Sequence, residues 1–381
     1  MAKRRAKGDG AIFFDDKRKV YVGQIGTGLD KNGKRKRKTV YGKTKAEVKQ
    51  KLKAIEFQIY EGSFVHESGI TIYQLAMQII ADKLNQGEIK ETTYHTNVET
   101  LKQLEPLYTV PLQSVNETLI KDFLLTKTDY SQSTLNKIYG LLKTIFKESV
   151  KRRISSYNPM ENVKKPKSKQ KNIKVRALTS EEQRRLVDVL LNEDINYSRQ
   201  MLLSMFTGMR MGEINALEVS DVNLKFNVIS VNKTISRGKR GEALISDTTK
   251  TRAGTRHIPM TERVKDIIID SIGEKTSGLI FTHNGGMITT CQVNLQFKRV
   301  LRKYNVLDTT LEGKIGVHSL RHTYGTRCVE GGMSFKVLQE LMGHTDIRIT
   351  MNTYCDATND FINDNISRVN QYMETIGLAS F

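Results

Sequence analysis

The sequence predicts a multidomain α+β protein: a small sheet plus one helix, then an all-α domain, then a mixed α/β, mainly helical domain. The length of 381 residues suits two or three domains, and 38% of the residues are hydrophobic, which is enough for at least one sizeable core. Strand-forming residues cluster in the first 65 residues, and helical periodicity dominates beyond them. The expected domain boundaries are 1–65, 66–170 and 171–381.

The first domain is expected to hold two short strands, RKVYVGQIGTG and KRKRKTVYGK, joined by the turn DKNGK. The helix TKAEVKQKLKAIEFQIY follows, with Val48, Leu52 and Ile55 near one face. Basic residues far outnumber acidic ones in this segment, which favours a nucleic-acid-binding patch over an ordinary charged surface. The candidate DNA contacts here are Lys19, Tyr21, Arg35, Lys36, Arg37 and Lys38.

The second domain is expected to be helical because TIYQLAMQIIADKL and STLNKIYGLLKTIFKESVKRRI carry apolar stripes at helical spacing. We interpret these stripes as core, and Ser133 or Thr134 is the expected cap of the second helix. The basic end of that helix adds Lys151, Arg152 and Arg153 as candidate DNA contacts. The lysine- and proline-rich segment NPMENVKKPKSKQKNIKVRAL is typical of an extended linker that follows DNA.

The third domain is expected to open with a helix over LTSEEQRRLVDVLL, where Thr179 and Glu182 form a capping box. Strands are expected at NVISVNKTI and TRHIPMT. The end of the chain predicts a tail helix with the apolar residues Phe361, Ile362, Ile366, Val369 and Met373.

The formal net charge of +20 indicates a polyanion as partner. Nucleic acid is favoured over a membrane surface because no amphipathic anchor, lipidation signal, secretory signal or membrane-length apolar run is recognisable. Three scattered cysteines, at positions 291, 328 and 355, form no CxxC pair and suit a reducing compartment. We therefore expect a soluble cytoplasmic protein that binds nucleic acid.

Short motifs in the third domain hold the candidate site residues. FTGMRMGEINAL places Arg210 just inside the start of a helix, with Glu213 one turn later. Taken alone, this pair would suggest a surface ion pair that contributes little to stability. HSLRH places His318 and Arg321 on one helix face, and TMNTY ends on Tyr354.

Two histidines near these motifs need separate interpretation. His318 and His322 are four residues apart, the spacing of a zinc site, but the glutamate of an HExxH motif is missing and Arg321 would repel a cation. We expect no metal and regard His322 as structural. His344 follows Gly343, which is typical of a helix C-cap.

Taken together, the motifs resemble those of the tyrosine recombinases, also called phage-type integrases. TGMRMGEINAL is similar to the first arginine box of that family, HSLRHTYGT to its second, and LMGHTDIRITMNTY to its histidine–tyrosine box. The domain order resembles most closely the integrases of conjugative transposons (integrative and conjugative elements). The resemblance implies an arm-type DNA-binding domain over 1–65, a core-binding domain over 66–170, and a catalytic domain over 171–381.

The resemblance implies a phosphoryl transfer without a metal or another cofactor, in which Arg210 and Arg321 neutralise the charge of the transition state. Tyr354 would attack the phosphodiester and form a 3′-phosphotyrosine; Tyr304, Tyr324 and Tyr372 are its competitors. Because a phenol has a pKa of about 10, the nucleophile needs a base.

The remaining roles follow from the same resemblance. His318 is the candidate base, His344 would donate to the phosphate, and Glu213 would orient the site. Lys250, on a strand–turn–strand hairpin, would protonate the leaving 5′-hydroxyl, with Lys239 and Arg252 as rivals.

The implied function is site-specific recombination for excision and integration of a mobile element through a Holliday junction. A homotetramer would act on double-stranded DNA in the bacterial nucleoid, at arm-type and core sites and at target DNA. The tail helix would pack on a neighbouring protomer, or on its own domain. An excision accessory protein and a host DNA-bending protein are further partners that the sequence leaves open. The alternatives are a type IB topoisomerase-like enzyme and a DNA-binding regulator without catalytic activity.

Overall fold

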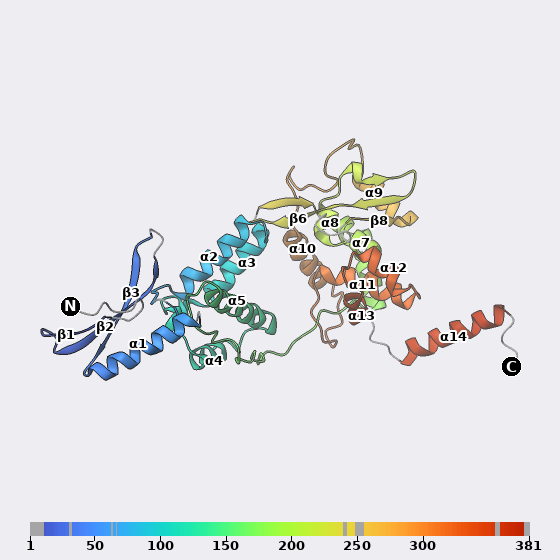
Figure 1. The fold of residues 1–381 in the computed structure, drawn as a ribbon. Coiled ribbons are helices and arrows are strands. Elements are labelled where there is room, and N and C mark those ends of the chain that lie inside the picture. Colours follow the sequence, from blue (N-terminus) through green and yellow to red (C-terminus); the bar gives the residue numbers. More distant parts are fainter. Residues whose placement is uncertain are drawn as a thin grey trace. The chain divides into compact units, whose positions relative to one another are not determined.

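The computed structural model describes residues 11–29, 33–61, 64–65, 67–238, 242–247, 255–354 and 359–376. The chain divides into two compact units, Met1–Lys171 and Asn172–Phe381. In the described residues, the first unit holds a small sheet followed by helices, and the second is a helix-rich α/β unit (Figure 1).

The first unit begins with an antiparallel sheet of order β1–β2–β3, formed by β1 (Ala11–Asp15), β2 (Val20–Leu29) and β3 (Arg35–Gly42). The two strands expected from the sequence are confirmed. β1 was not expected, because a run of five residues carries little pattern and gains its stability from pairing with β2. Part of the expected turn, residues 30–32, lies outside the described residues.

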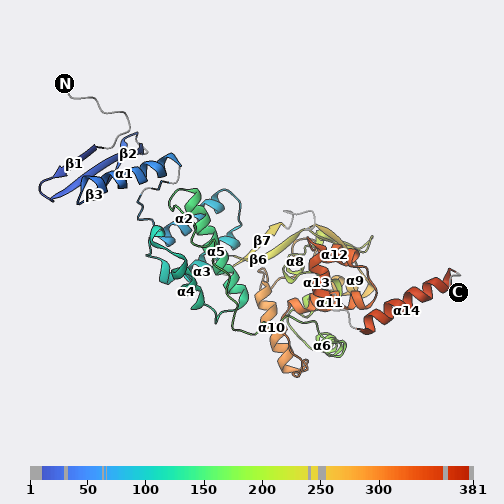
Figure 2. The same cartoon turned by 60° about the horizontal axis from the view of Figure 1, so that its bottom comes forward.

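Helix α1 (Lys45–Tyr60) covers one face of this sheet, as Figures 1 and 2 show. Thr44 caps its first turn, and Val48 and Leu52 pack with Ile25 in a small core. A Cβ at Gly23 would lie 2.5 Å from Val48 Cγ1, so the close approach of α1 requires glycine there. This core is separate from the one in the helices that follow.

The helices that follow α1 in the first unit share a core that contains the apolar stripes expected from the sequence. Ser131 caps α5, so the expected cap at Ser133 or Thr134 is wrong: the helix begins two residues earlier, at Gln132. Leu135, Ile138 and Leu142 are fully buried. The helices are α2 (Ile72–Asn85), α3 (Glu91–Lys102), η1 (Glu105–Leu107), η2 (Leu112–Ser114), α4 (Glu117–Leu125) and α5 (Gln132–Lys151).

The second unit is mainly helical. Its helices are α6 (Ser180–Asn192), α7 (Ser198–Thr207), α8 (Met211–Asn215), η3 (Val219–Asp221), α9 (Glu262–Ile272), α10 (Thr290–Lys303), α11 (His318–Glu330), α12 (Phe335–Met342), α13 (Ile347–Tyr354) and α14 (Asn359–Thr375). One antiparallel sheet has the order β4–β5–β8, and β6 pairs with β7 in a hairpin. These strands are β4 (Val222–Asn223), β5 (Val228–Val231), β6 (Lys233–Arg237), β7 (Ala243–Asp247) and β8 (Arg256–Pro259). Helix α11 packs against α7, and α13 packs against α12 and α11 (Figure 2).

A buried carboxylate ties the start of the second unit together. Glu182 lies in the first turn of α6, and the capping box with Thr179 is confirmed. Arg176 donates to both carboxylate oxygens at 2.6 and 2.7 Å, and the backbone N–H of Asp308 donates at 2.9 Å. Burial alone would raise the pKa of Glu182, but these hydrogen bonds outweigh it and lower the pKa to about 2.

Within the part of the chain that the structure describes, none of the helices is both long enough and apolar enough to cross a bilayer.

We predict that Glu182→Gln destabilises the protein by about 3 kcal/mol at pH 7, because it leaves the half-buried Arg176 without its charged partner. Thermal or urea unfolding of the full chain measures this loss. The carboxylate contributes fully above pH 4.5, its ordinary value, and loses its effect as the pH falls toward 2. The difference between the two proteins should shrink over that range.

Glu181→Gln is the matched control, since Glu181 is exposed in the same helical turn and pairs with Arg184 and Arg185. We expect a change below about 1 kcal/mol for it. Equal losses for the two variants would contradict a special role for the buried carboxylate.

Candidate active site

Arg210 lies where α7 ends and α8 begins. Gly208 ends α7 with a positive φ of 67°, and a Cβ there would lie 2.4 Å from the Tyr324 ring. Arg210 follows as the extended N-cap residue of α8, so its expected place inside the helix is corrected by one residue. The expected pair with Glu213 is present: Arg210 donates from its backbone N at 2.9 Å and from Nη1 at 2.8 Å.

Glu213 is buried, with 3% of its surface exposed, and it also binds Arg256 of strand β8. Arg256 donates from Nη1 at 3.1 Å and from Nη2 at 2.7 Å, one bond to each carboxylate oxygen. Burial would raise the pKa of Glu213, but the bonds and charge of Arg256, together with the charge of Arg210, hold it at about 2. The carboxylate therefore stays ionised and fixes both guanidinium groups.

Arg321 is almost completely buried on α11. Its Nη1 donates to the carbonyl oxygen of Gly208 at 2.7 Å, and its Nη2 donates to that of Met342. Arg210 Nη2 donates to the next carbonyl, that of Gly343, at 3.1 Å. The two arginines therefore meet at consecutive carbonyls where α12 ends, although they lie 111 positions apart in the chain.

Histidines complete this cluster. His318 and His322 lie one turn apart on α11 with ring centroids 4.8 Å apart. Burial, and then the charges of His322 and Arg321, lower the pKa of His318 to about 4. Its side chain still reaches the surface, so solvent weakens this effect, but the direction favours a neutral ring at pH 7.

His344 directly follows Gly343, whose positive φ of 63° confirms the expected C-cap. Burial, and then the charges of Arg321 and Arg210, lower the pKa of His344 to about 4. Because the same two arginines act on both His318 and His344, these four side chains form one electrostatic cluster.

Tyr354 is the last residue of α13, the helix that packs against α12 and α11. The structure describes its place in the helix and not its side chain. Lys250 lies outside the described residues, as do its rivals Lys239 and Arg252. The described strands on either side, β7 and β8, frame the segment that carries Lys250.

The competing tyrosines have other surroundings. Tyr324 packs against the segment at Gly208 and hydrogen-bonds Cys328, and burial raises its pKa. Tyr304 donates to Glu193 at 2.8 Å, and Tyr372 is exposed on α14. None of these contacts involves the described members of the arginine–histidine cluster.

Sequence reasoning missed two residues of this site. Arg256 alternates with Ile258 as a buried position of β8, so an arginine at an inward position of a strand was the available signal. Thr350 is buried and lies 2.8 Å from His344 Nδ1 through its Oγ1. Its position four residues before Tyr354 in the histidine–tyrosine box was the signal for it.

The DNA-contact candidates in the first unit fall into different environments. Tyr21 lies on the face of the sheet that α1 covers and packs against the small core, so it is not on the open face. The register instead places Phe13, Val22 and Tyr41 together on the face opposite α1, where Phe13 and Tyr41 are exposed and Val22 between them is buried. Arg18 lies over the Tyr41 ring at 5.6 Å and donates to its hydroxyl at 3.2 Å.

The basic residues divide in a similar way. Strand alternation places Arg35 and Arg37 on the face of Tyr41, while Lys36 and Lys38 point to the other face, where Lys38 pairs with Glu67. Lys19 has a positive φ in the turn before β2, and Arg153 has one after α5.

Arg152 is held by two carboxylates, at 2.8 Å from Glu148 and 2.9 Å from Asp82. Lys151 lies 3.9 Å from Glu148 and is exposed. Arg152 is therefore part of the packing around α5 as well as a candidate contact.

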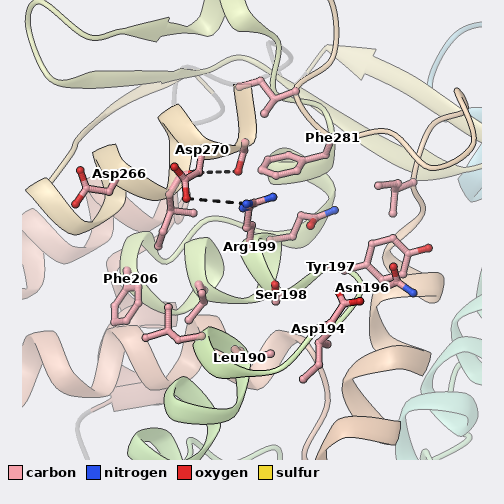
Figure 3. Close-up of a pocket in the computed structure, with 18 of the residues that line it drawn as sticks. Leu190, Asp194, Asn196, Tyr197, Ser198, Arg199, Phe206, Asp266, Asp270 and Phe281 are labelled. Atoms are coloured by element: carbon pink, nitrogen blue, oxygen red, sulfur yellow. Dashed lines mark hydrogen bonds and ion pairs between the residues drawn. The ribbon is translucent and has the colours of Figure 1, made fainter. Parts of the chain in front are cut away.

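A cavity of about 870 Å³ lies elsewhere in the second unit, between the end of α6, the start of α7 and α9. Figure 3 shows Arg199 and Asp270 facing each other across it, at an N–O distance of 3.9 Å. None of the described site residues lines this cavity, so it is separate from the cluster around Arg210 and Arg321.

Comparison with known proteins gives relatives over most of the chain. Residues 176–360 match the model of the phage integrase family. The transposase of transposon Tn916 from Enterococcus faecalis is 24% identical over 340 residues, which cover 85% of this chain and 83% of the transposase. The integrase of Staphylococcus phage L54a is 27% identical over 339 residues, which cover 73% of this chain and 94% of the phage protein.

Solved structures share the fold. The Tn1549 transposon integrase in complex with circular intermediate DNA gives a TM-score of 0.67 at 25% identity, over 79% of this chain and 100% of that chain. A lambda integrase tetramer bound to a Holliday junction gives 0.55 at 17% identity, over 92% and 96% of the two chains. Residues 176–360 of this chain therefore form a phage integrase domain, the domain of the tyrosine recombinases.

Proposed function

We propose that this chain is the site-specific DNA recombinase of a mobile element, an integrase of the conjugative-transposon type that catalyses excision and integration. The observation that carries this proposal is the meeting of Arg210 and Arg321 at the carbonyls of Gly343 and Met342, beside His344. The same unit presents Tyr354 at the end of α13. The transposase and integrase names of the relatives agree with this function.

The arginines supply the charge that phosphoryl transfer needs. The transition state at a DNA phosphate carries more negative charge than the ground state, and guanidinium forks can donate to its nonbridging oxygens. Arg321 is held by two backbone carbonyls and Arg210 by Glu213, so both are preorganised before DNA arrives. This clamp requires no divalent metal and no ATP.

The remaining residues move protons. Tyr354 attacks the phosphorus and forms a 3′-phosphotyrosyl ester, while the 5′-oxygen of the next nucleotide leaves. His318 favours the neutral form at pH 7, so it can accept the phenolic proton. Lys250 protonates the leaving oxygen, and His344 donates to the phosphate. Attack by the 5′-hydroxyl of another strand reverses these steps and restores the phenol, which gives strand exchange through a Holliday junction.

DNA is the partner that the charge of +20 favours. We propose that residues 1–65 bind arm-type sites through the open face of the sheet around Tyr41, that residues 66–170 bind the core site, and that residues 171–381 carry the chemistry. Four copies would act together on DNA in the bacterial nucleoid, as in the lambda integrase tetramer bound to a Holliday junction. An excision accessory protein and a host DNA-bending protein remain further candidate partners.

We predict that wild-type protein exchanges flanking sequence between two sites on a plasmid that carries the ends of the element. Tyr354→Phe should bind the same DNA with unchanged affinity and form no covalent adduct, since it lacks the attacking oxygen. Tyr372→Phe is the matched control and should keep the adduct. An adduct formed by the Tyr354→Phe protein would exclude this nucleophile.

The same plasmid assay separates the alternatives. Relaxation of a plasmid with one site and no exchange would indicate a topoisomerase-like enzyme, and binding without either reaction would indicate a regulator.

Addition of EDTA should leave cleavage unchanged because the arginines hold the phosphate. Cleavage that is lost with EDTA and restored by Mg²⁺ would contradict the metal-free mechanism.

We predict that Arg256→Lys lowers the rate of DNA cleavage about tenfold to a hundredfold, which is roughly 1.4 kcal/mol of barrier for each factor of ten. Lysine keeps the charge near Glu213 but lacks the planar fork whose two nitrogens each bond one carboxylate oxygen, so Arg210 loses its fixed position. Single-turnover cleavage of a labelled site measures the rate.

Arg185→Lys is the matched control, because Arg185 pairs with Glu181 at 3.0 Å on the exposed side of α6. It should cleave like the wild type. Wild-type cleavage by the Arg256→Lys protein would show that the buried pair does not position Arg210.

Helix α14 is proposed to pack on a neighbouring protomer. Ile366, Val369, Tyr372 and Met373 are exposed on it, and Arg368 donates to the Glu330 carbonyl at 3.2 Å. Ending the chain at residue 358 should weaken assembly of the tetramer on DNA, measured by native gel shift with two sites. Unchanged assembly and strand exchange would favour packing of α14 on its own domain.

A further inference from the structure

The side chain of His344 has one described hydrogen-bond partner, Thr350. The distance from His344 Nδ1 to Thr350 Oγ1 is 2.8 Å, and Thr350 is completely buried at 0% exposure. When a buried hydroxyl is hydrogen-bonded to one ring nitrogen of a histidine, that bond determines whether the other ring nitrogen carries the proton.

The backbone of His344 is fixed from a different element. Its N–H donates to the Gln339 carbonyl at 3.1 Å, and Gln339 Nε2 donates to the His344 carbonyl at 3.1 Å. Thus α12 holds the main chain of the histidine while α13 holds its ring. The ring orientation therefore depends on the seating of α13 against α12.

The hydrogen bond between His344 and Thr350 can run in two directions. If Thr350 Oγ1–H donates to Nδ1, the single proton of the neutral ring lies on Nε2. If Nδ1–H donates to Oγ1, Nε2 is an acceptor and would face an anionic phosphate oxygen with a lone pair. Only the first arrangement makes Nε2 a donor to DNA, and the nearby cations Arg321, Arg210 and Arg256 disfavour a second proton on the ring.

We propose that Thr350 is a positioning residue that donates to His344 Nδ1, holds the ring proton on Nε2, and does so only while α13 is seated. Thr350 precedes Tyr354 by four residues, so the hydroxyl of Thr350 and the residue that carries the nucleophile belong to neighbouring turns of the same helix, α13. Seating of the nucleophile helix thereby prepares His344 to donate to the same phosphate. This inference rests on the proposed function and extends it to the coupling of two site residues.

The first test is the tautomer of His344 in the full-length chain. Labelling the seven histidines with ¹⁵N and recording long-range ¹H–¹⁵N spectra identifies which ring nitrogen carries the proton, and His344→Gln assigns the signal. We expect the Nε2–H tautomer in the wild type and in Thr350→Ser, which keeps the hydroxyl. Thr350→Val should shift His344 toward a mixture of tautomers.

Thr323→Val is the matched control for the loss of a buried hydroxyl. Thr323 is also fully buried, and its hydroxyl accepts from Leu178 N–H at 2.9 Å and donates to the Ser319 carbonyl at 2.8 Å. This variant should lose stability and keep the wild-type signal of His344. A change at His344 in both valine variants would mean a general loosening of the domain and would overturn the proposal.

The second test is a double-mutant cycle on single-turnover DNA cleavage. Thr350→Val should slow cleavage about tenfold to a hundredfold, within the contribution of a general acid or donor group, and Thr350→Ser should restore most of the rate. Because Thr350 acts through His344, adding Thr350→Val to His344→Gln should cause little further loss. Affinity for DNA should not change.

Additive losses in this cycle, or a Thr350→Val protein that keeps the Nε2–H tautomer, would overturn the inference. Failure of Thr350→Ser to restore cleavage would do the same. If the wild-type chain cleaves no DNA, the proposed function fails, while the spectra of the free protein still decide whether Thr350 sets the tautomer.

Discussion

The buried carboxylate of Glu213 is the interaction on which the site depends. It accepts hydrogen bonds from Arg210 and from Arg256, and it is nearly excluded from water. A buried carboxylate is costly unless it is paired, and here two guanidinium groups and one backbone N–H pair with it. The pair restrains Arg210 in the position from which it reaches the end of α12. The catalytic arrangement therefore rests on a residue that need not touch DNA.

A second constraint is the turn at the end of α12. Its last carbonyls accept from Arg321 and Arg210, and the next residue is His344. A helix C-terminus presents carbonyls without partners inside the helix, and cations stabilise that end. Gly343 provides the left-handed conformation that the turn needs. One short piece of backbone thereby brings together residues from three separate motifs.

The first unit uses charge differently. Its small sheet has one face covered by α1 and an open face on which Arg18 lies over Tyr41. Several of its cations have partners within the protein, as Arg152 has with Glu148 and Asp82. A high net charge therefore indicates the class of partner, while the contacts within the fold decide which cations are available to it.

The sequence by itself predicted most of the helices, the main strands, and the candidate site residues. Capping at Thr179, the apolar stripe of α5 and the C-cap at Gly343 are local patterns, and the structure confirms each of them. Local patterns do not record contacts between distant segments. Only the tertiary structure assigned Arg256 to Glu213, because that bond joins a strand and a helix 43 positions apart. It also placed Tyr21 toward α1, since pairing in the sheet selects the face of each side chain.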